Sequence, residues 1–291
     1  MVDSMNKEQI IKRQKASQII RKVVVYAFLG IMALIIIFPF YWMLISSVKS
    51  LDEYYLSSPT MFPREFHFEN FRNAMAYASF GRYMLNTVFV GLVSTVLSLV
   101  ITIFAAFAFS RLEFVGRDAL FSVLLATMMV PGELFTITNY ATVSKFGWQN
   151  TYTVLIVPFL VSVFYIYLLR QNFKQIPNEL YYAAKVDGTS DFKYLWKVMV
   201  TLSMPTIISI TILKMMGSWN SYIWPRLVAN DEAHKLITNG LRTAFTNAET
   251  GRTDIPLQMA ACVIVSLPLF LVFVFFRKYI MRGVSKSGIK G

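Results

Sequence analysis

Six apolar runs, each long enough to cross a lipid bilayer as a helix, alternate with polar segments along the chain. A transmembrane helix needs roughly 20 apolar residues, and the lipid core admits only backbones whose hydrogen bonds are made internally. Only 15% of the residues are charged, which agrees with a chain that lies largely in lipid. We therefore expect an all-α membrane protein with six transmembrane helices, at about 23–47, 83–110, 119–140, 151–169, 198–225 and 256–276.

The basic residues are distributed unequally between the two sides that six spans create. Segments 1–22, 110–118, 170–197 and 277–291 together hold 18 Lys or Arg residues, whereas 48–82, 140–150 and 226–255 hold nine. Because positively charged segments stay in the cytoplasm, we expect the first set, and with it both termini, to be cytoplasmic. The predicted order is a basic tail at 1–22, a first span at 23–47, a largely irregular extracytoplasmic loop at 48–82, a core of five spans at 83–276 and a basic tail at 277–291.

The polar segment 176–197 lies between two spans and has its own helix signals. Pro177 and Asn178 are typical of a helix start, and Gly188 is typical of the left-handed residue that follows a helix end. Thr189 or Ser190 can then cap a second helix. The pair Ala183 and Ala184 leaves room for another backbone to approach. The pattern predicts a short helix that docks on another protein.

This segment resembles a known motif. The sequence ELYYAAKVDG, followed after nine residues by VMVT, resembles the EAA loop of ATP-binding-cassette importer permeases of the maltose and glycerol-3-phosphate type. Two positions depart from the family pattern, since Tyr182 replaces the usual Glu and Thr201 replaces a Pro. The alternative is an ordinary connection between two spans. In the family the loop forms a coupling helix, and the resemblance assigns ATPase coupling to Glu179, Tyr182, Ala183, Ala184, Asp187 and Gly188.

Shorter segments match the same family in the same order. They are SSVKS at 46–50, SRLEFVGRD at 110–118, WNSYIWP at 219–225 and the basic tail at 277–291. The resemblance implies a type I importer permease fold in the bacterial inner membrane, and one half of a translocation pathway for a carbohydrate. It also implies a second permease, two ATPase subunits that bind the ATP, and an extracytoplasmic binding protein as partners.

Chemistry for catalysis is missing from the sequence. There is no phosphate-binding G-x-x-x-x-G-K-[ST] motif and no H-E-x-x-H motif, and His67 and His234 are the only histidines. The single Cys262 lies in an apolar run. We therefore expect no enzyme activity, no cofactor and no metal site. The basic residues follow the membrane topology, so we expect lipid and no nucleic acid as partner.

Two charged residues fall inside predicted spans, Glu133 beside Pro131-Gly132 and Lys214 in the fifth run. Such groups are costly in lipid, and they pair with each other or face a cavity. At about 1.5 Å per residue, both lie roughly 21–24 Å along their helices from the cytoplasmic ends, so they can meet. They form either a structural ion pair or part of the translocation pathway. A stand-alone secondary transporter, in which these two groups couple transport to an ion, is the alternative function.

The position of the WNSYIWP segment also has two possible interpretations. Trp and Tyr side chains gather at membrane interfaces because they are amphipathic. Trp219, Asn220 and Tyr222 also combine ring faces with hydrogen-bonding groups, as sugar binding requires. We expect these three residues either in an interfacial belt or on the wall of the pathway.

Overall fold

The computed structural model describes residues 2–76, 79–246 and 251–285. Within these ranges the regular secondary structure is helical apart from one isolated bridge between Thr246 and Thr253, which confirms the predicted all-α class. The first half contains α1 (Val2–Ser46), α2 (Leu51–Tyr54), α3 (Glu69–Ala76), α4 (Phe80–Arg111), α5 (Arg117–Thr127), η1 (Gly132–Phe135), α6 (Thr136–Lys145) and α7 (Tyr152–Ile156). The second half contains η2 (Val157–Phe159), α8 (Val163–Lys174), α9 (Asn178–Val186), α10 (Asp191–Tyr194), the π-helical η3 (Leu195–Met199), α11 (Val200–Leu202), α12 (Met204–Trp219), α13 (Ile223–Val228), α14 (Ile237–Thr243) and α15 (Ile255–Ser285).

The described chain has three unbroken helices that are long and apolar enough to cross a membrane, Ser17–Ser46, Phe80–Arg111 and Ile255–Lys278. Three further pairs meet the same criteria when each bent pair is taken as one span, which brings the number to six. They are Arg117–Thr127 with Gly132–Lys145, bent by 81°, Tyr152–Phe159 with Val163–Lys174, bent by 45°, and Asp191–Leu202 with Met204–Trp219, bent by 80°. All six predicted runs therefore correspond to candidate spans.

Proline accounts for the position of two bends. Pro131 directly precedes η1, at the interruption that the sequence predicts in the third run. The fifth run differs from the prediction, because 198–225 is not one helix. Pro205 is the second residue of α12, where a backbone N–H would have no partner within the helix anyway. In the middle of one continuous helix, the same proline would remove a hydrogen bond and break the helix. The chain turns at Ser203 and α12 ends at Trp219.

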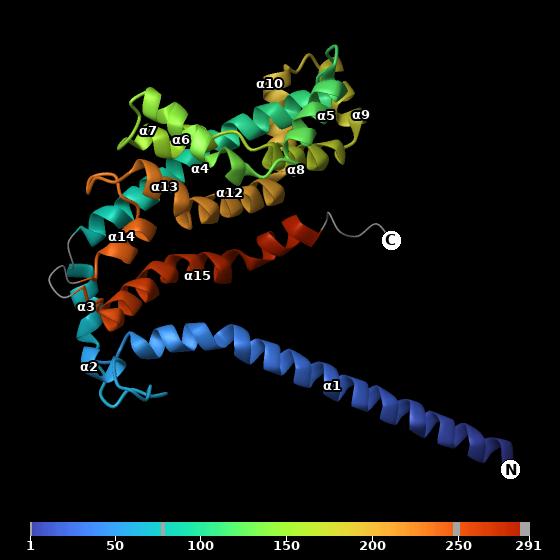
Figure 1. Ribbon diagram of the computed structural model, residues 1–291. Helices are drawn as coiled ribbons and strands as arrows, with labels where there is room; N and C mark the ends of the chain where they lie inside the picture. Colours follow the sequence, from blue (N-terminus) through green and yellow to red (C-terminus); the bar gives the residue numbers. More distant parts are fainter. Residues whose placement is uncertain (1, 77–78, 247–250, 286–291) are drawn as a thin grey trace.

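Helix α4 lies at the centre of the fold, packed against α8 and α12 (Figure 1). Its buried side chains include a series of small polar residues, Ser94, Ser98 and Thr102, together with Gly91. Small residues let membrane helices approach closely. The largest core joins Phe107 of α4 to residues of α8, α10, η3, α11 and α12, among them Leu169, Phe173, Tyr194, Met199 and Ile210.

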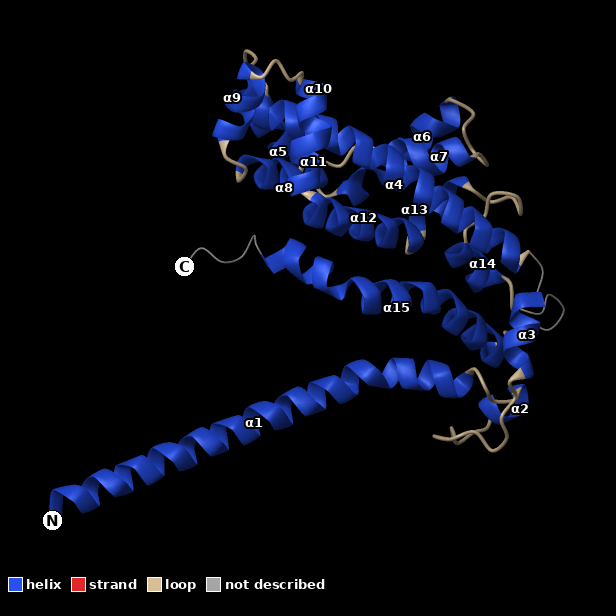
Figure 2. Ribbon diagram, turned by 180° about the vertical axis from the view of Figure 1, so that it is seen from behind, coloured by secondary structure: helices blue, strands red, loops and turns tan. Residues whose placement is uncertain are grey.

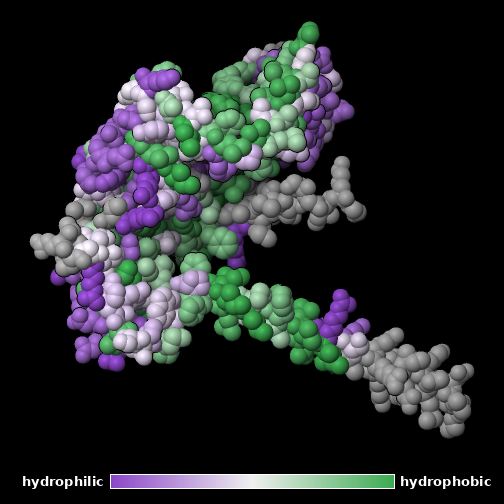
Figure 3. Space-filling view, viewed as in Figure 1, coloured by the Kyte–Doolittle hydropathy of each residue, from purple (hydrophilic) through white to green (hydrophobic). Residues whose placement is uncertain are grey.

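Helix α1 stands away from the rest of the molecule for most of its length. The segments predicted as a tail at 1–22 and a span at 23–47 form this one helix. An apolar 18-residue window within Ser17–Ser46 has no residue buried within the chain, and Figure 3 shows hydrophobic side chains along this part of the helix. Its C-terminal part packs against α15. Lipid or another chain must therefore cover its apolar surface.

The short helices divide between two ends of the molecule. Figures 1 and 2 place α9 at the same end as the start of α1 and the last turns of α15. Helices α2, α3 and α14 lie at the opposite end. Segment 48–82 thus carries the two short helices α2 and α3, where the sequence led us to expect little regular structure.

Candidate coupling surface and membrane pocket

Helix α9 ends as its sequence predicts. Gly188 has a φ of +70°, a conformation that residues with a Cβ rarely adopt. The N–H of Gly188 donates to the carbonyl of Lys185 at 3.0 Å, and the N–H of Thr189 donates to that of Ala184 at 2.8 Å. These two bonds form a Schellman motif, which satisfies the last carbonyls of the helix. Ser190, not Thr189, then caps α10 by accepting from the N–H of Lys193.

The two faces of α9 differ in exposure. Glu179, Tyr182, Ala183 and Val186 follow the helical repeat and are all exposed, with Tyr182 at 59% and Val186 at 88%. We call these four residues the α9 stripe. Ala184 is turned the other way and packs against the largest core. The predicted coupling residues therefore separate, with Asp187 and Gly188 exposed at the end of the helix and Ala184 supporting it from inside.

The start of α10 holds α9 in place. The Asp191 carboxylate accepts from the Lys185 ammonium at 2.7 Å and from the Tyr181 hydroxyl at 2.8 Å. The hydrogen bond to Asp191 raises the pKa of Lys185. Burial, and then the hydrogen bond to the same carboxylate, raise the pKa of Tyr181. Both groups therefore keep their protons at neutral pH, and the two helices stay joined.

Arg111, at the end of α4, makes a connection that the sequence analysis missed. Its guanidinium donates to the carbonyl of Phe173 at 2.8 Å, to that of Ile176 at 2.5 Å and to the Asn178 side-chain oxygen at 2.6 Å. Carbonyls at a helix C-terminus lack partners within the helix and attract cations. Arg111 thus binds the end of α8 and the start of α9. Asn178, which the sequence predicts at the start of α9, is the first residue of this helix and accepts this bond from Arg111.

Arg170 of α8 makes the reciprocal contact. Its Nε donates to the carbonyl of Phe109 near the end of α4 at 2.9 Å, and its guanidinium lies 3.1 Å from Asp118. The same group stacks over the Phe121 ring, 3.9 Å from its centre. Each of the two helices therefore supplies an arginine that satisfies carbonyls near the end of the other. The only sequence signal was that Arg111 belongs to the 110–118 turn that resembles the family.

A cleft of about 830 Å³ lies between this turn and α9. Its cations are Arg111, Arg117, Lys174 and Lys185, and its acids are Glu113 and Asp191. Tyr182 of the α9 stripe also lines this cleft.

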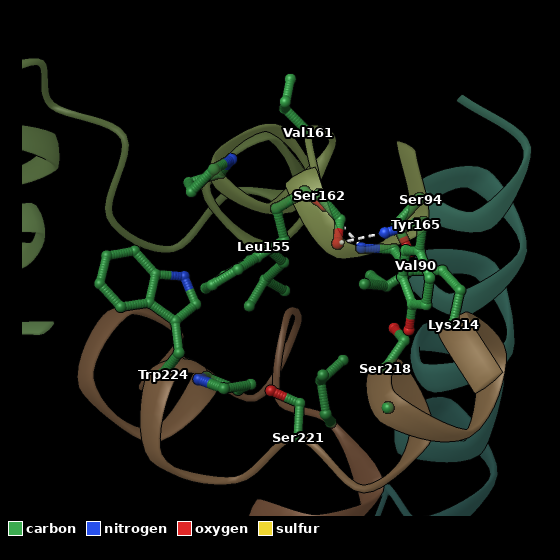
Figure 4. A pocket seen from close by; sticks show the side chains of 15 residues that line it. Val90, Ser94, Leu155, Val161, Ser162, Tyr165, Lys214, Ser218, Ser221 and Trp224 are labelled. Carbon is green, nitrogen blue, oxygen red and sulfur yellow. Dashed lines mark hydrogen bonds between the residues drawn. The ribbon is translucent and has the colours of Figure 1, made fainter. Parts of the chain in front are cut away.

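A second cavity, of about 410 Å³, lies within the span region between α4, the α7–α8 bend and α12–α13. We call it the membrane pocket. Figure 4 shows Lys214 and Trp224 on opposite sides of it. The lining includes the hydroxyl groups of Ser94, Ser162, Tyr165, Ser218 and Ser221.

Lys214 and Glu133 are not brought together in this conformation. The Lys214 ammonium donates to the Phe159 carbonyl at 2.5 Å, at the bend between η2 and α8. Glu133 is exposed on η1 and does not line the membrane pocket. None of the ion pairs among the described residues joins the two. This conformation therefore shows no ion pair between the two residues.

The three residues of the WNSYIWP segment that were predicted as possible pathway residues do not line the membrane pocket either. Trp219 is 5% exposed and packs in a core with Phe80 and Tyr83. Asn220 donates to the Met216 carbonyl at the end of α12. The Tyr222 hydroxyl accepts hydrogen bonds from two arginines. From the same segment, the pocket is lined instead by Ser221, Trp224 and Pro225.

Comparison with known proteins identifies this arrangement. Residues 98–286 match the family described as "Binding-protein-dependent transport system inner membrane component". The chain belongs to this family. The family is one of membrane transport components, and no group of three or more His, Cys, Asp or Glu that could hold a metal lies in the described ranges.

Two curated relatives and one solved structure show the extent of the similarity. The diacetylchitobiose uptake system permease protein NgcG of Streptomyces coelicolor is 30% identical over 264 residues, covering 90% of this chain and 87% of that protein. The arabinooligosaccharides transport system permease protein AraQ of Halalkalibacterium halodurans is 27% identical, with 96% of this chain and all of the relative covered. A chain of a bacterial ABC transporter involved in alginate import aligns with a TM-score of 0.82 at 23% identity, over 90% of this chain and 97% of that one. This last match confirms the predicted permease fold.

Proposed function

We propose that this chain is the permease subunit of an ATP-driven carbohydrate importer and forms one half of its translocation pathway. The exposed α9 stripe in a chain of this family carries the proposal. A helix that leaves Tyr182 and Val186 uncovered, on a base fixed by Arg111, is built to receive another protein. The names of the relatives NgcG and AraQ support a carbohydrate as substrate.

The partners follow from this assignment. We infer a second permease, two ATPase subunits, one of which binds the α9 stripe, and an extracytoplasmic binding protein at the end that carries α2, α3 and α14. This places the start of α1, α9 and the last turns of α15 in the cytoplasm. ATP-driven movement of the ATPases would push α9, and the bonds of Arg111 would pass that movement to α8 and α4.

The test is a charge placed on the α9 stripe. Val186→Asp alters an 88% exposed side chain, so the chain itself should fold normally. In the assembled importer the new carboxylate would be buried against the ATPase, which is costly without a partner. We expect ATP hydrolysis stimulated by the binding protein to fall by about tenfold or more, which corresponds to roughly 1.4 kcal/mol. Gly188→Val, which forces a β-branched residue into the left-handed region, should have a similar effect.

The matched control is Val115→Asp. Val115 is fully exposed in the 110–118 turn, at the same end of the molecule but off α9. This variant should keep normal stimulation. Normal stimulation in Val186→Asp and Gly188→Val as well would remove α9 from the coupling role.

A further inference from the structure

The membrane pocket contains a cation without a matching acid. Its lining includes Lys214 and, among the described residues, no Asp or Glu. Among the described residues, the Lys214 ammonium makes one hydrogen bond, to the backbone carbonyl of Phe159. A neutral carbonyl leaves the positive charge of this half-buried side chain uncompensated inside a candidate membrane span. Charges in such places are paired or serve a function.

The lining is otherwise suited to a small polar molecule. Its volume of about 410 Å³ lies in the range of ligand sites, which is roughly 300–1,000 Å³. Ser94, Ser162, Tyr165, Ser218 and Ser221 supply hydroxyls that can both donate and accept hydrogen bonds, and Trp224 supplies an aromatic surface. A sugar can use both kinds of group, because its hydroxyls form hydrogen bonds with such side chains and its C–H face packs on an aromatic ring. A neutral sugar, however, would leave the charge of Lys214 unmatched.

Two further cations lie beyond the pocket. Arg226 of α13 and Arg242 of α14 each donate to the Tyr222 hydroxyl at 2.6 Å, so two guanidinium groups meet at one oxygen. Neither arginine takes part in an ion pair among the described residues. Tyr222 lies in sequence between Ser221 and Trp224, which line the pocket. Like charges this close together favour binding of an anion, and they raise its local concentration.

We propose that the membrane pocket binds a saccharide that carries an anionic group, a carboxylate or a phosphate, with Lys214 as its counter-ion. The inference rests on the proposed function as an importer permease and specifies the substrate of that pathway. Arg226 and Arg242 would attract the anion before it reaches the pocket. Lys214 exchanges its bond to the Phe159 carbonyl for the anion, at the bend between η2 and α8.

Matched pairs of saccharides test the charge directly. The importer, reconstituted in vesicles with its partner subunits and binding protein, is given oligomers of galacturonate, glucuronate or mannuronate, each beside its carboxyl-reduced, neutral form. Sugar phosphates form a separate arm beside the unphosphorylated sugars, which separates carboxylate from phosphate as the source of the anion. We expect uptake of at least one anionic saccharide to exceed that of its neutral form by tenfold or more. Equal or greater uptake of the neutral forms throughout would overturn the proposal.

Variants of Lys214 then locate the effect. Lys214→Met should lower uptake of the anionic saccharide by about tenfold, the factor that a lost interaction of roughly 1.4 kcal/mol produces. Lys214→Arg should retain most of the uptake because it keeps the charge. Lys145→Met, which removes an exposed cation at the end of α6, should change nothing. Equal uptake in the wild-type importer and Lys214→Met would assign the anion to another site.

Two outcomes separate this inference from the proposed function. If the wild-type importer hydrolyses ATP in response to its binding protein but does not distinguish charged from neutral saccharides, only the inference fails. If the binding protein elicits no ATP hydrolysis at all, the proposed function fails. Should Lys214→Met not assemble, Lys214→Gln takes its place, because it loses the charge but can still donate to the Phe159 carbonyl.

Discussion

Arg111 is the residue through which α4, α8 and α9 meet. Its guanidinium satisfies the Phe173 and Ile176 carbonyls at the end of α8 and the Asn178 side chain at the start of α9. The residue is buried, so water cannot replace these bonds when the side chain is removed. Its loss therefore affects both the stability of the fold and the position of the helix proposed to meet the ATPase.

We expect Arg111→Ala to destabilise the assembled importer. A hydrogen bond to a charged group contributes roughly 1.5–3 kcal/mol, and the three bonds share one side chain, so a total loss of roughly 3 kcal/mol is reasonable. The measurement is thermal unfolding of the purified complex, together with its stimulated ATP hydrolysis. Arg82→Ala, which removes an exposed arginine at the opposite end of α4, is the control and should leave both unchanged. Equal melting temperatures for the two variants would show that Arg111 is not a structural connection.

The predictions for single residues succeeded where local chemistry decides the outcome. The end of α9 at Gly188 could be predicted because the left-handed conformation of that residue depends only on Gly188 and its neighbours in sequence. The roles of Ala184 and Trp219 depend on how the helices are rotated in the packed molecule, and both turn toward a core. The pairing of Glu133 with Lys214 was inferred from their matched depth and from the cost of an isolated charge in lipid. Depth leaves helix rotation open, and rotation decides which groups meet.

At the scale of elements, the spans could be predicted and their bends only in part. Each apolar run has to be buried in lipid, so hydropathy alone locates it. Pro131 and Gly132 together indicate the bend in the third apolar run. Pro205 was an equally valid signal, but the apolar composition continues across it, and 198–225 was therefore taken as one span. Helices α3 and α14 were missed because they are short and lie in polar segments. Contacts with α4 and α15 hold both of them in place.

The docking of α14 on α4 depends on a glycine. A Cβ added at Gly240 would lie 2.2 Å from the ring of Tyr83. Tyr83 is buried and donates a hydrogen bond to Glu232, so its ring has little freedom to move. We expect Gly240→Ala to destabilise the protein by about 1–3 kcal/mol, the usual cost of overpacking. Thermal unfolding of the purified complex measures this effect.

Gly81→Ala is the matched control for this variant. A Cβ at Gly81, in the first turn of α4, meets nothing within 4 Å, so the protein should be as stable as the wild type or slightly more so. In a Tyr83→Leu background, Gly240→Ala should cost less than it does alone, because the obstructing ring is gone. Equal costs in the two backgrounds would mean that the ring of Tyr83 is not what opposes the substitution.

At the scale of the whole molecule, the chain does not cover its own apolar surface. An apolar 18-residue window within Ser17–Ser46 has no buried residue, and the corresponding window within Ile255–Lys278 is 17% buried. A chain of this family would cover such surfaces with lipid and with the second permease that we propose. The overall class and the number of runs were predictable because the membrane constrains every span separately. The separation of α1 from the core was not, since the contacts that decide it involve molecules outside the chain.

The arrangement of the ends gives a direct test of orientation. Helix α9, the start of α1 and the last turns of α15 lie toward the same end of the molecule, and α2 and α3 lie at the other end (Figures 1 and 2). The uneven distribution of Lys and Arg predicts that the end with α9 is cytoplasmic. In a Cys262→Ala background, an impermeant thiol reagent added to intact cells should label Ser58→Cys and leave Ser190→Cys unlabelled. Both side chains are exposed on the isolated chain, so exposure alone does not separate them.

Permeabilising the cells supplies the control, because Ser190→Cys should then react as Ser58→Cys does. If Ser190→Cys reacts only after permeabilisation, α9 lies on the side where ATP is available, as an ATPase partner requires. Reaction of Ser190→Cys in intact cells would place α9 outside the cell. The α9 stripe could not then meet an ATP-hydrolysing subunit, and its exposed Tyr182 and Val186 would need a different partner.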